Sequence, residues 1–285
     1  MKKIISNIAA SIKARLLNIS RDTGKDFNKI LLRYFQERFL YRLSVSEYKD
    51  NFILKGGLLL ILINIPTSRV TMDIDFLAAR VKNDLESVKN IFGKISSIKV
   101  QDGVVFDDSS VTAERIEKDS EYKGVRVKIQ GNLGSVKQLL QIDLGFGDVI
   151  FPKKSDIEFP SVVLEDKSKL KGYPLETVVS EKFEAMVKLG MLNSRMKDFY
   201  DVYVLLNSQK FEETVLKEAI KRTFNNRKTQ LPQEPLVFTS EFYNDKAKQT
   251  QWKAFLRKNK LTDIPQDFKD IVIAIKNYLQ YFERR

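Results

Sequence analysis

The sequence predicts an α+β protein, a mixed sheet with flanking helices followed by a helical bundle. Three observations predict it: helical spacing of apolar residues over the first 45 residues, strand-like alternation over residues 104–150, and helical spacing after Pro174. The change from a mixed to a helical pattern falls near residue 160. We therefore expect one domain over residues 1–160 and a second, helical domain over residues 161–285.

The expected elements follow in order along the chain. In the first domain we expect helices over residues 5–45, with a break near Asp22-Thr23-Gly24, and over 58–63 and 81–96; strands are expected over 52–54, 70–77, 111–118, 125–130 and 138–146. In the second domain we expect helices over residues 175–189, 195–206, 211–224, 244–258 and 266–283. The apolar spacing of Trp252 and Phe255 favours a packed helix over a base-stacking surface.

Composition excludes several kinds of chemistry. The 285 residues include 43% hydrophobic and 30% charged side chains, with no cysteine and no histidine. Disulfides, Cys/His zinc sites, thiol nucleophiles and Ser-His-Asp triads are therefore impossible. Catalysis would have to depend on carboxylates, lysine, arginine, tyrosine, hydroxyls or a metal with oxygen ligands. The longest apolar run, residues 58–63, is too short for a membrane span, so we expect a cytoplasmic protein with no membrane partner.

The net charge of +12 is concentrated at the two ends of the chain. Residues 1–50 carry 11 basic and 5 acidic side chains, residues 51–209 carry 22 of each, and residues 210–285 carry 16 basic and 10 acidic. Basic surfaces attract polyanions, chiefly nucleic acid, although lysines scattered over helices also serve solubility.

Three aspartates form the main candidate site. In the strand pattern TMDIDF, Asp73 and Asp75 share one face, about 6.6 Å apart by strand rise, while apolar residues occupy the other face. Asp143 interrupts the apolar strand pattern QLLQIDLGF. Two carboxylates on one face require a cation, and magnesium prefers oxygen ligands. Upstream, Gly56-Gly57 lies between a strand and a helix, where backbone can approach a phosphate closely.

These features resemble the polymerase-beta-like nucleotidyltransferases. Within that superfamily the chain is similar to the AbiEii group, the toxins of type IV toxin–antitoxin and abortive infection systems. The resemblance covers nearly the whole chain, through ERFLYRLSVSEYKDNFILKGG, TSRVTMDIDF, the GFGD stretch after Asp143, and SEKFEAMVKLGMLNSRMKDFYDVYVL. It implies a polymerase-beta-like mixed sheet and transfer of a nucleoside monophosphate from a nucleoside triphosphate.

The resemblance also implies roles for particular residues. Asp73, Asp75 and Asp143 would bind magnesium or manganese, with Asp143 as the proton acceptor. The Gly56 and Gly57 amides, with Lys55 or Lys182, would hold the phosphates. Ser68, Arg69 and Thr71 could add phosphate contacts, because the Gly-Ser that is frequent in the family's first motif is Gly-Gly here.

A lysine on one helix and an aspartate on the next are needed for activity in this family. Lys182 and Asp198 match those positions, with Lys188 as the rival lysine. Lys182 lies beside an apolar stripe of its helix, so it needs an anionic partner. On the next helix, Asp198 shares a face with Asp201. A structural salt bridge between the two helices is the alternative interpretation.

The acceptor is inferred from the charge distribution, and the antitoxin partner from the resemblance. Basic ends favour an RNA acceptor, tRNA in particular, and the toxin assignment implies an antitoxin encoded adjacently. Two other functions stay open: a nucleotidyltransferase acting on a small molecule such as an antibiotic, and a nucleic-acid-binding protein without enzymatic activity.

Overall fold

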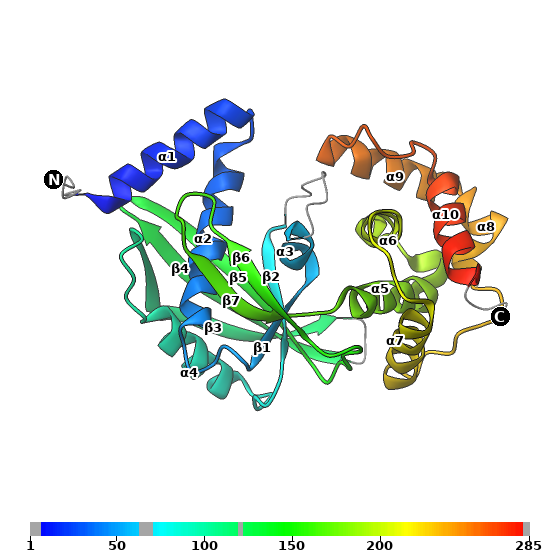
Figure 1. The fold of residues 1–285 in the computed structure, drawn as a ribbon, viewed down its shortest axis with the longest axis horizontal. Coiled ribbons are helices and arrows are strands. Elements are labelled where there is room, and N and C mark those ends of the chain that lie inside the picture. The colour runs from blue at the N-terminus through cyan, green and yellow to red at the C-terminus, as the bar shows by residue number, and fades with distance from the viewer. Residues whose placement is uncertain (1–6, 63–70, 119–121, 282–285) are drawn as a thin grey trace. The chain divides into compact units, whose positions relative to one another are not determined.

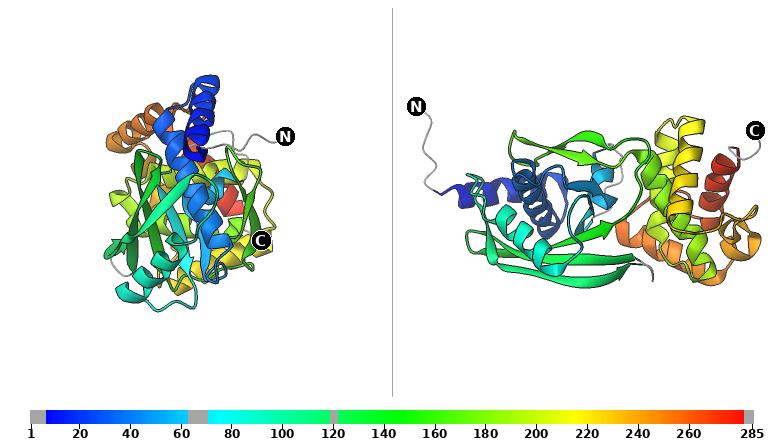
Figure 2. Two further views of the ribbon diagram at one scale, coloured as in Figure 1. Left: turned by 90° about the vertical axis from the view of Figure 1, so that its left-hand side faces the viewer. Right: turned by 90° about the horizontal axis from the view of Figure 1, so that it is seen from below.

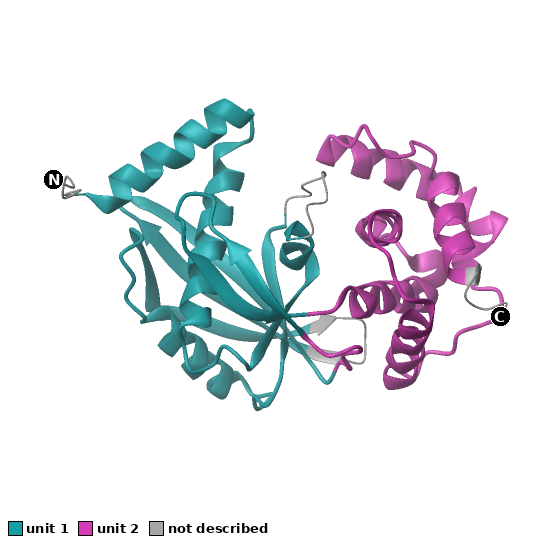
Figure 3. Cartoon of the chain, viewed as in Figure 1, with its two compact units in different colours: residues 1–62, 70–147, 155–172 teal, residues 63–69, 148–154, 173–285 magenta. Residues whose placement is uncertain are grey.

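The computed structural model describes residues 7–62, 71–118 and 122–281 (Figure 1). The chain forms two compact units (Figure 3). Of the described residues, the sheet unit contains 7–62, 71–118, 122–147 and 155–172, and the helical unit contains 148–154 and 173–281. None of the helices in the described ranges is both long and apolar enough to cross a membrane.

The sheet unit has a mixed sheet flanked by helices, as the sequence predicts. Its helices are α1 (Ile8–Thr23), α2 (Phe27–Ser44), α3 (Gly56–Ile61) and α4 (Leu85–Ser96). Its strands are β1 (Phe52–Lys55), β2 (Asp73–Ala78), β3 (Val104–Lys118), β4 (Tyr122–Leu133), β5 (Val136–Phe146), β6 (Ser155–Pro160) and β7 (Lys167–Gly172). The strands form one sheet in the order β3-β4-β5-β2-β1-β7-β6, in which β1 and β7 are parallel, as are β2 and β5.

The last segment of the sheet unit ends at Gly172, whereas the sequence places the domain boundary near residue 160, and Asp148–Lys154 already belongs to the helical unit. The difference arises from β6 and β7, which the sequence analysis does not predict. β7 pairs with the central strand β1, so residues up to Gly172 belong to the sheet. Its sequence, KSKLKG, has lysine at alternate positions, and lysine is depleted in strands.

Side-chain caps fix where the first helices begin and end. The side chains of Asn7, Asp26 and Asp84 accept hydrogen bonds from the first turns of α1, α2 and α4. Gly24, in the left-handed conformation, ends α1 and produces the break that the sequence predicts between α1 and α2.

One face of the sheet is apolar and is covered by α2 and α4 (Figure 2). Phe92 of α4 packs against Phe39 of α2 at 5.8 Å between ring centroids and against Phe52 of β1 at 5.1 Å. Phe52 in turn contacts Phe76 of β2 at 5.9 Å. All four rings are fully buried, so this face supplies much of the hydrophobic stabilisation of the unit.

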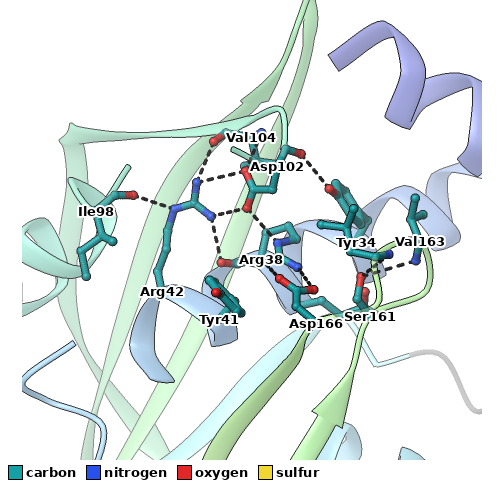
Figure 4. A network of polar contacts seen from close by, with 12 residues as sticks. Tyr34, Arg38, Tyr41, Arg42, Ile98, Asp102, Val104, Ser161, Val163 and Asp166 are labelled. Atoms are coloured by element: carbon teal, nitrogen blue, oxygen red, sulfur yellow. Dashed lines mark hydrogen bonds and ion pairs between the residues drawn. The ribbon is translucent and has the colours of Figure 1, made fainter. Parts of the chain in front are cut away.

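Buried ion pairs fix α2 to two loops of the same unit (Figure 4). Arg38 and Arg42 both contact the Asp102 carboxylate at 2.8 Å, in the segment before β3. Arg38 also forms two 2.8 Å hydrogen bonds with Asp166, just before β7. The two arginines and Asp102 are buried, so these two basic residues balance internal carboxylates and are not part of a cationic surface.

The helical unit contains the C-terminal bundle that the sequence predicts. Its elements are α5 (Leu175–Leu189), a short 3-10 helix (Gly190–Leu192), α6 (Met196–Ser208), α7 (Glu213–Asn226), a second 3-10 helix (Leu236–Phe238), α8 (Ser240–Tyr243), α9 (Lys246–Asn259) and α10 (Phe268–Tyr281). Trp252 is fully buried, stacks on Phe255 and donates a hydrogen bond to the carbonyl of Pro265. The packing interpretation of Trp252 and Phe255 is therefore confirmed.

Candidate active site

The polar face of the sheet brings the three predicted aspartates together. On β2, Ile74 and Phe76 are fully buried, and Asp73 and Asp75 alternate with them. β5 runs parallel to β2 with Asp143 opposite Asp75. Residues paired across neighbouring strands have side chains on the same face of a sheet. Asp143 therefore lies on the same face as Asp73 and Asp75.

Two cationic residues flank the aspartates in the same row. Lys55 of β1 pairs with Asp75, and Arg126 of β4 pairs with Asp143. The order across the four strands is thus cation, carboxylate, carboxylate, cation. Like charges directly opposite one another destabilise a sheet, and a cation beside each carboxylate offsets that repulsion.

Arg126 binds the Asp143 carboxylate through two hydrogen bonds. Its Nε and Nη2 atoms lie 2.9 and 3.0 Å from the two carboxylate oxygens, which is a bidentate pair. The Asp143 side chain is 2% exposed and that of Arg126 is 30% exposed. The hydrogen bonds to Asp143 raise the pKa of Arg126 above its ordinary value. Arg126 therefore supplies the charge that a buried carboxylate at position 143 requires.

Asp73 has a neighbour on β5 as well. Gln141, opposite Asp73 in the strand register, donates a hydrogen bond from Nε2 to Asp73 Oδ1 at 2.9 Å. The backbone before Asp73 is fixed by Gln36 of α2, which donates to the carbonyl of Thr71 at 3.3 Å and to that of Met72 at 3.2 Å. This part of the polar face is therefore connected to both β5 and α2.

Gly56 occupies a place that a side chain cannot fill. Its φ is +67°, and a Cβ atom at this position would lie 2.2 Å from Asp75 Oδ2 and 2.8 Å from Asp75 Cβ. The first residue of α3 therefore packs directly against the Asp75 carboxylate, and glycine is required for both reasons. Gly57, which follows, is buried. Backbone amides in the first turn of a helix have no partner within that helix, so this turn can offer N–H groups to an anion.

Of the three further residues predicted to contact phosphate, the structure describes one. The Thr71 hydroxyl lies near the candidate site and donates to the carbonyl of Asp73 at 3.3 Å. Ser68 and Arg69 lie outside the described residues.

The fit of a divalent metal depends on the side-chain positions of the aspartates. Three carboxylates on one face match the oxygen ligands that magnesium and manganese prefer. Within residues 7–62, 71–118 and 122–281, no three acidic side chains are grouped so that they could hold a metal ion as they stand. At Asp143, both carboxylate oxygens accept hydrogen bonds from Arg126. The three carboxylates are the right kind of ligand and lie on the same face of the sheet. At Asp143 a metal would compete with Arg126 for the carboxylate oxygens.

The helical unit holds the second predicted group. Lys182 of α5 lies 2.7 Å from Asp198 and 2.8 Å from Asp201, both on α6. Arg195 also lies 2.6 Å from Asp198. Lys188 is exposed at the end of α5, so Lys182 is the lysine that contacts Asp198. The structure thus contains the inter-helix ion pair that the sequence analysis gives as the alternative to a catalytic role.

Attraction outweighs burial in setting the pKa values of this group. Burial of Lys182 opposes its charge, but the two aspartates raise the pKa of Lys182 above its ordinary value. Burial of the Asp198 carboxyl opposes ionisation, but Lys182 and Arg195 lower its pKa below the ordinary 3.8. Both partners are therefore charged at neutral pH.

Sequence reasoning did not single out Arg126, Gln141 or Arg195. Strand alternation in VRVKIQ and QLLQIDLGF shows that Arg126 and Gln141 lie on polar faces. It does not give the register between strands, and the register is what places Arg126 opposite Asp143.

Comparisons with known proteins show the family and the fold of this chain. Residues 38–274 match the sequence model of the family described as nucleotidyl transferase AbiEii toxin, type IV TA system. The fold is similar to that of a candidate nucleotidyltransferase from Helicobacter pylori, with a TM-score of 0.53 and 15% identity over 91% of this chain and 96% of the other. It is also similar to JHP933 from Helicobacter pylori, with a TM-score of 0.50 and 16% identity over 89% and 91%. No curated protein sequence matches the chain.

Replacing Gly56 by alanine should disturb the Asp75 carboxylate. We expect Gly56→Ala to lower stability by more than Gly24→Ala and to reduce activity at least about tenfold, since the new methyl group overlaps Asp75. Gly24 is the matched control because its φ is +65° and nothing lies within 4 Å of a Cβ there. It isolates the backbone strain, about 1–2 kcal/mol. Urea unfolding and transfer assays on both variants measure the difference, and equal effects of the two substitutions would contradict the close contact.

The Lys182–Asp198 pair should give a pH-dependent contribution to stability. We expect Asp198→Asn to lower the free energy of unfolding by about 3 kcal/mol near pH 7, because it leaves a buried ammonium with less compensation. Since the folded-state pKa of Asp198 is below 3.8, the contribution is complete above that pH and is lost as the pH falls through the folded-state value. The stability difference between wild type and variant should therefore narrow only in strong acid. Denaturant titrations at several pH values test this, with Asp270→Asn at an exposed position on α10 as control. A difference independent of pH argues against the ion pair.

Proposed function

Because this chain belongs to the AbiEii family of nucleotidyltransferase toxins of type IV toxin–antitoxin systems, we propose that its polar sheet face is the active site. There it would transfer a nucleoside monophosphate from a nucleoside triphosphate to an acceptor, with a divalent metal. The observation that supports this most strongly is the register of β2 and β5, which sets Asp143 opposite Asp75 on the face that also carries Asp73.

The residues of this face have distinct proposed roles. Asp73 and Asp75 would hold magnesium or manganese, with Asp143 once released from Arg126. When bound, the metal would stabilise the negative charge on the α-phosphate. The backbone amides of Gly56 and Gly57, together with Lys55, would hold the β- and γ-phosphates beside Asp75. Thr71, Ser68 and Arg69 are proposed as further phosphate contacts.

The proposed reaction is an in-line displacement. The acceptor hydroxyl oxygen forms a bond to the α-phosphorus, the bond to the oxygen that bridges the α- and β-phosphates breaks, and pyrophosphate leaves. Asp143 would receive the proton of the attacking hydroxyl, which requires that its carboxylate is free of Arg126 at that moment. Lys182 and Asp198 are also proposed to be required for activity, by their match to the family's motif. Their mutual ion pair is compatible with a purely structural role too.

We propose an RNA acceptor, tRNA in particular, and an antitoxin encoded next to this chain. The net charge of +6 over residues 210–285 favours a polyanionic acceptor. A small-molecule acceptor is the second candidate, since it needs the same carboxylates and no basic surface. Binding of RNA that weakens steeply with salt would favour RNA over a small molecule.

Removing one metal-binding carboxylate should abolish transfer without unfolding the protein. We expect Asp73→Asn to lower the rate at least about a thousandfold, because the amide cannot neutralise a metal. The assay uses labelled nucleoside triphosphates, total RNA and magnesium. Asp108→Asn, an exposed position on β3 of the same sheet, is the control and should retain wild-type activity. A fully active Asp73→Asn enzyme would rule out this face as the active site.

A further inference from the structure

A pocket of about 780 Å³ lies within the helical unit, beside α7. It is formed by one side of α7, by the segment that follows this helix, and by residues of α5, the second 3-10 helix and α10. None of the residues given a role in nucleotide transfer lines it. This pocket therefore needs a separate explanation.

The rim of the pocket is basic. Lys217, Lys221 and Lys228 line it, and none of the described residues that line it is acidic. Lys217 forms an ion pair with Glu213 at 2.9 Å. Lys221 and Lys228 are exposed, and no carboxylate of the described ranges forms an ion pair with either. Two such ammonium groups beside a concave site favour a ligand with negative charge.

The backbone that carries Lys228 is held in place. Lys228 has a φ of +51°, and the next residue, Thr229, donates a backbone hydrogen bond to the carbonyl of Phe224 at 3.0 Å. The Thr229 hydroxyl donates to Glu184, and Arg227 binds Glu184 at 2.8 Å. Hydrogen bonds on both sides of Lys228 therefore fix where its side chain leaves the chain, and the site is organised before any ligand binds.

The floor of the pocket is apolar, and the phenylalanine rings in it are only 2–3% exposed. Phe183 packs against Phe224 with ring centroids 5.5 Å apart and stacks on Phe238 at 5.6 Å. Asn225 and Gln230 are exposed on the same lining and can donate and accept hydrogen bonds. An apolar floor, amide groups and a cationic rim match the three parts of a nucleotide: a flat base, its polar edge and a phosphate.

We propose that this pocket binds an unpaired nucleotide of the RNA acceptor, with the phosphate at Lys221 and Lys228 and the base against the apolar floor. The proposal rests on the RNA acceptor proposed above and gives it a docking site in the helical unit. A base in a duplex is paired and stacked, so only a single-stranded segment can present it to such a pocket.

The test measures binding rather than transfer. Fluorescence anisotropy with a short single-stranded RNA compares wild type with the double variant Lys221→Gln/Lys228→Gln. The matched control is Lys253→Gln/Lys258→Gln, which removes the same charge from exposed positions on α9. We expect the pocket variant to bind at least about tenfold more weakly, and the slope of log K against log salt to fall by roughly 0.7 for the one phosphate that is no longer neutralised. The control should keep most of the affinity. Equal losses in the two double variants, or no loss in the pocket variant, would overturn the proposal.

Further ligands test the remaining parts of the proposal. An abasic oligonucleotide of the same length should bind at least about fivefold more weakly, because it lacks the base that would be buried against the apolar floor. A blunt RNA duplex should also bind more weakly than the single strand. A free mononucleotide that binds as tightly as the single strand and depends on the same lysines would show a small-molecule site and overturn the RNA assignment. Asp73→Asn should bind RNA normally, so a failure of nucleotide transfer and a failure of this pocket can be told apart.

Discussion

The proposed active site depends on the juxtaposition of two carboxylates, Asp75 and Asp143, on adjacent parallel strands. Such an arrangement is unfavourable by itself, because like charges opposite one another repel and Asp143 is almost completely buried. The protein compensates with Arg126 on one side and Lys55 on the other. A polar row of this kind, maintained across four strands, has little value for folding alone. It is well suited to binding cations and phosphates.

The rest of the sheet unit holds this row in place. The opposite face is an aromatic core under α2 and α4, which fixes the side of the sheet that each strand residue occupies. A slip of one residue in β2 would move Ile74 and Phe76 to the polar face and the aspartates into the core. Arg38 and Arg42 fix α2 to the segments before β3 and β7, so the helix that covers the apolar face is also bonded to the sheet. Packing of the apolar face therefore fixes which side chains lie on the polar face.

Much of this could be predicted from the sequence, and the exceptions have physical reasons. Alternation in TMDIDF places Asp73 and Asp75 on one face, and the isolated Asp143 in an apolar strand pattern indicates the third carboxylate of the candidate site. The partner of Asp143, Arg126, is set by the long-range register of β4 and β5, which local patterns do not encode. β7 is not predicted because it is short and has lysine at alternate positions, and lysine is depleted in strands. Counting charges in residues 1–50 overstates how basic the surface of this region is, because Arg38 and Arg42 are buried.

The most direct measurement is the position of a metal in the protein bound to a non-hydrolysable nucleoside triphosphate. Crystals of this complex grown with manganese would show the metal by anomalous scattering. The account predicts manganese bound to the carboxylates of Asp73 and Asp75, with the triphosphate beside Gly56 and the Asp143–Arg126 hydrogen bonds lengthened or broken. Nucleotide and metal bound elsewhere, with the aspartates of β2 still uncoordinated, would contradict it.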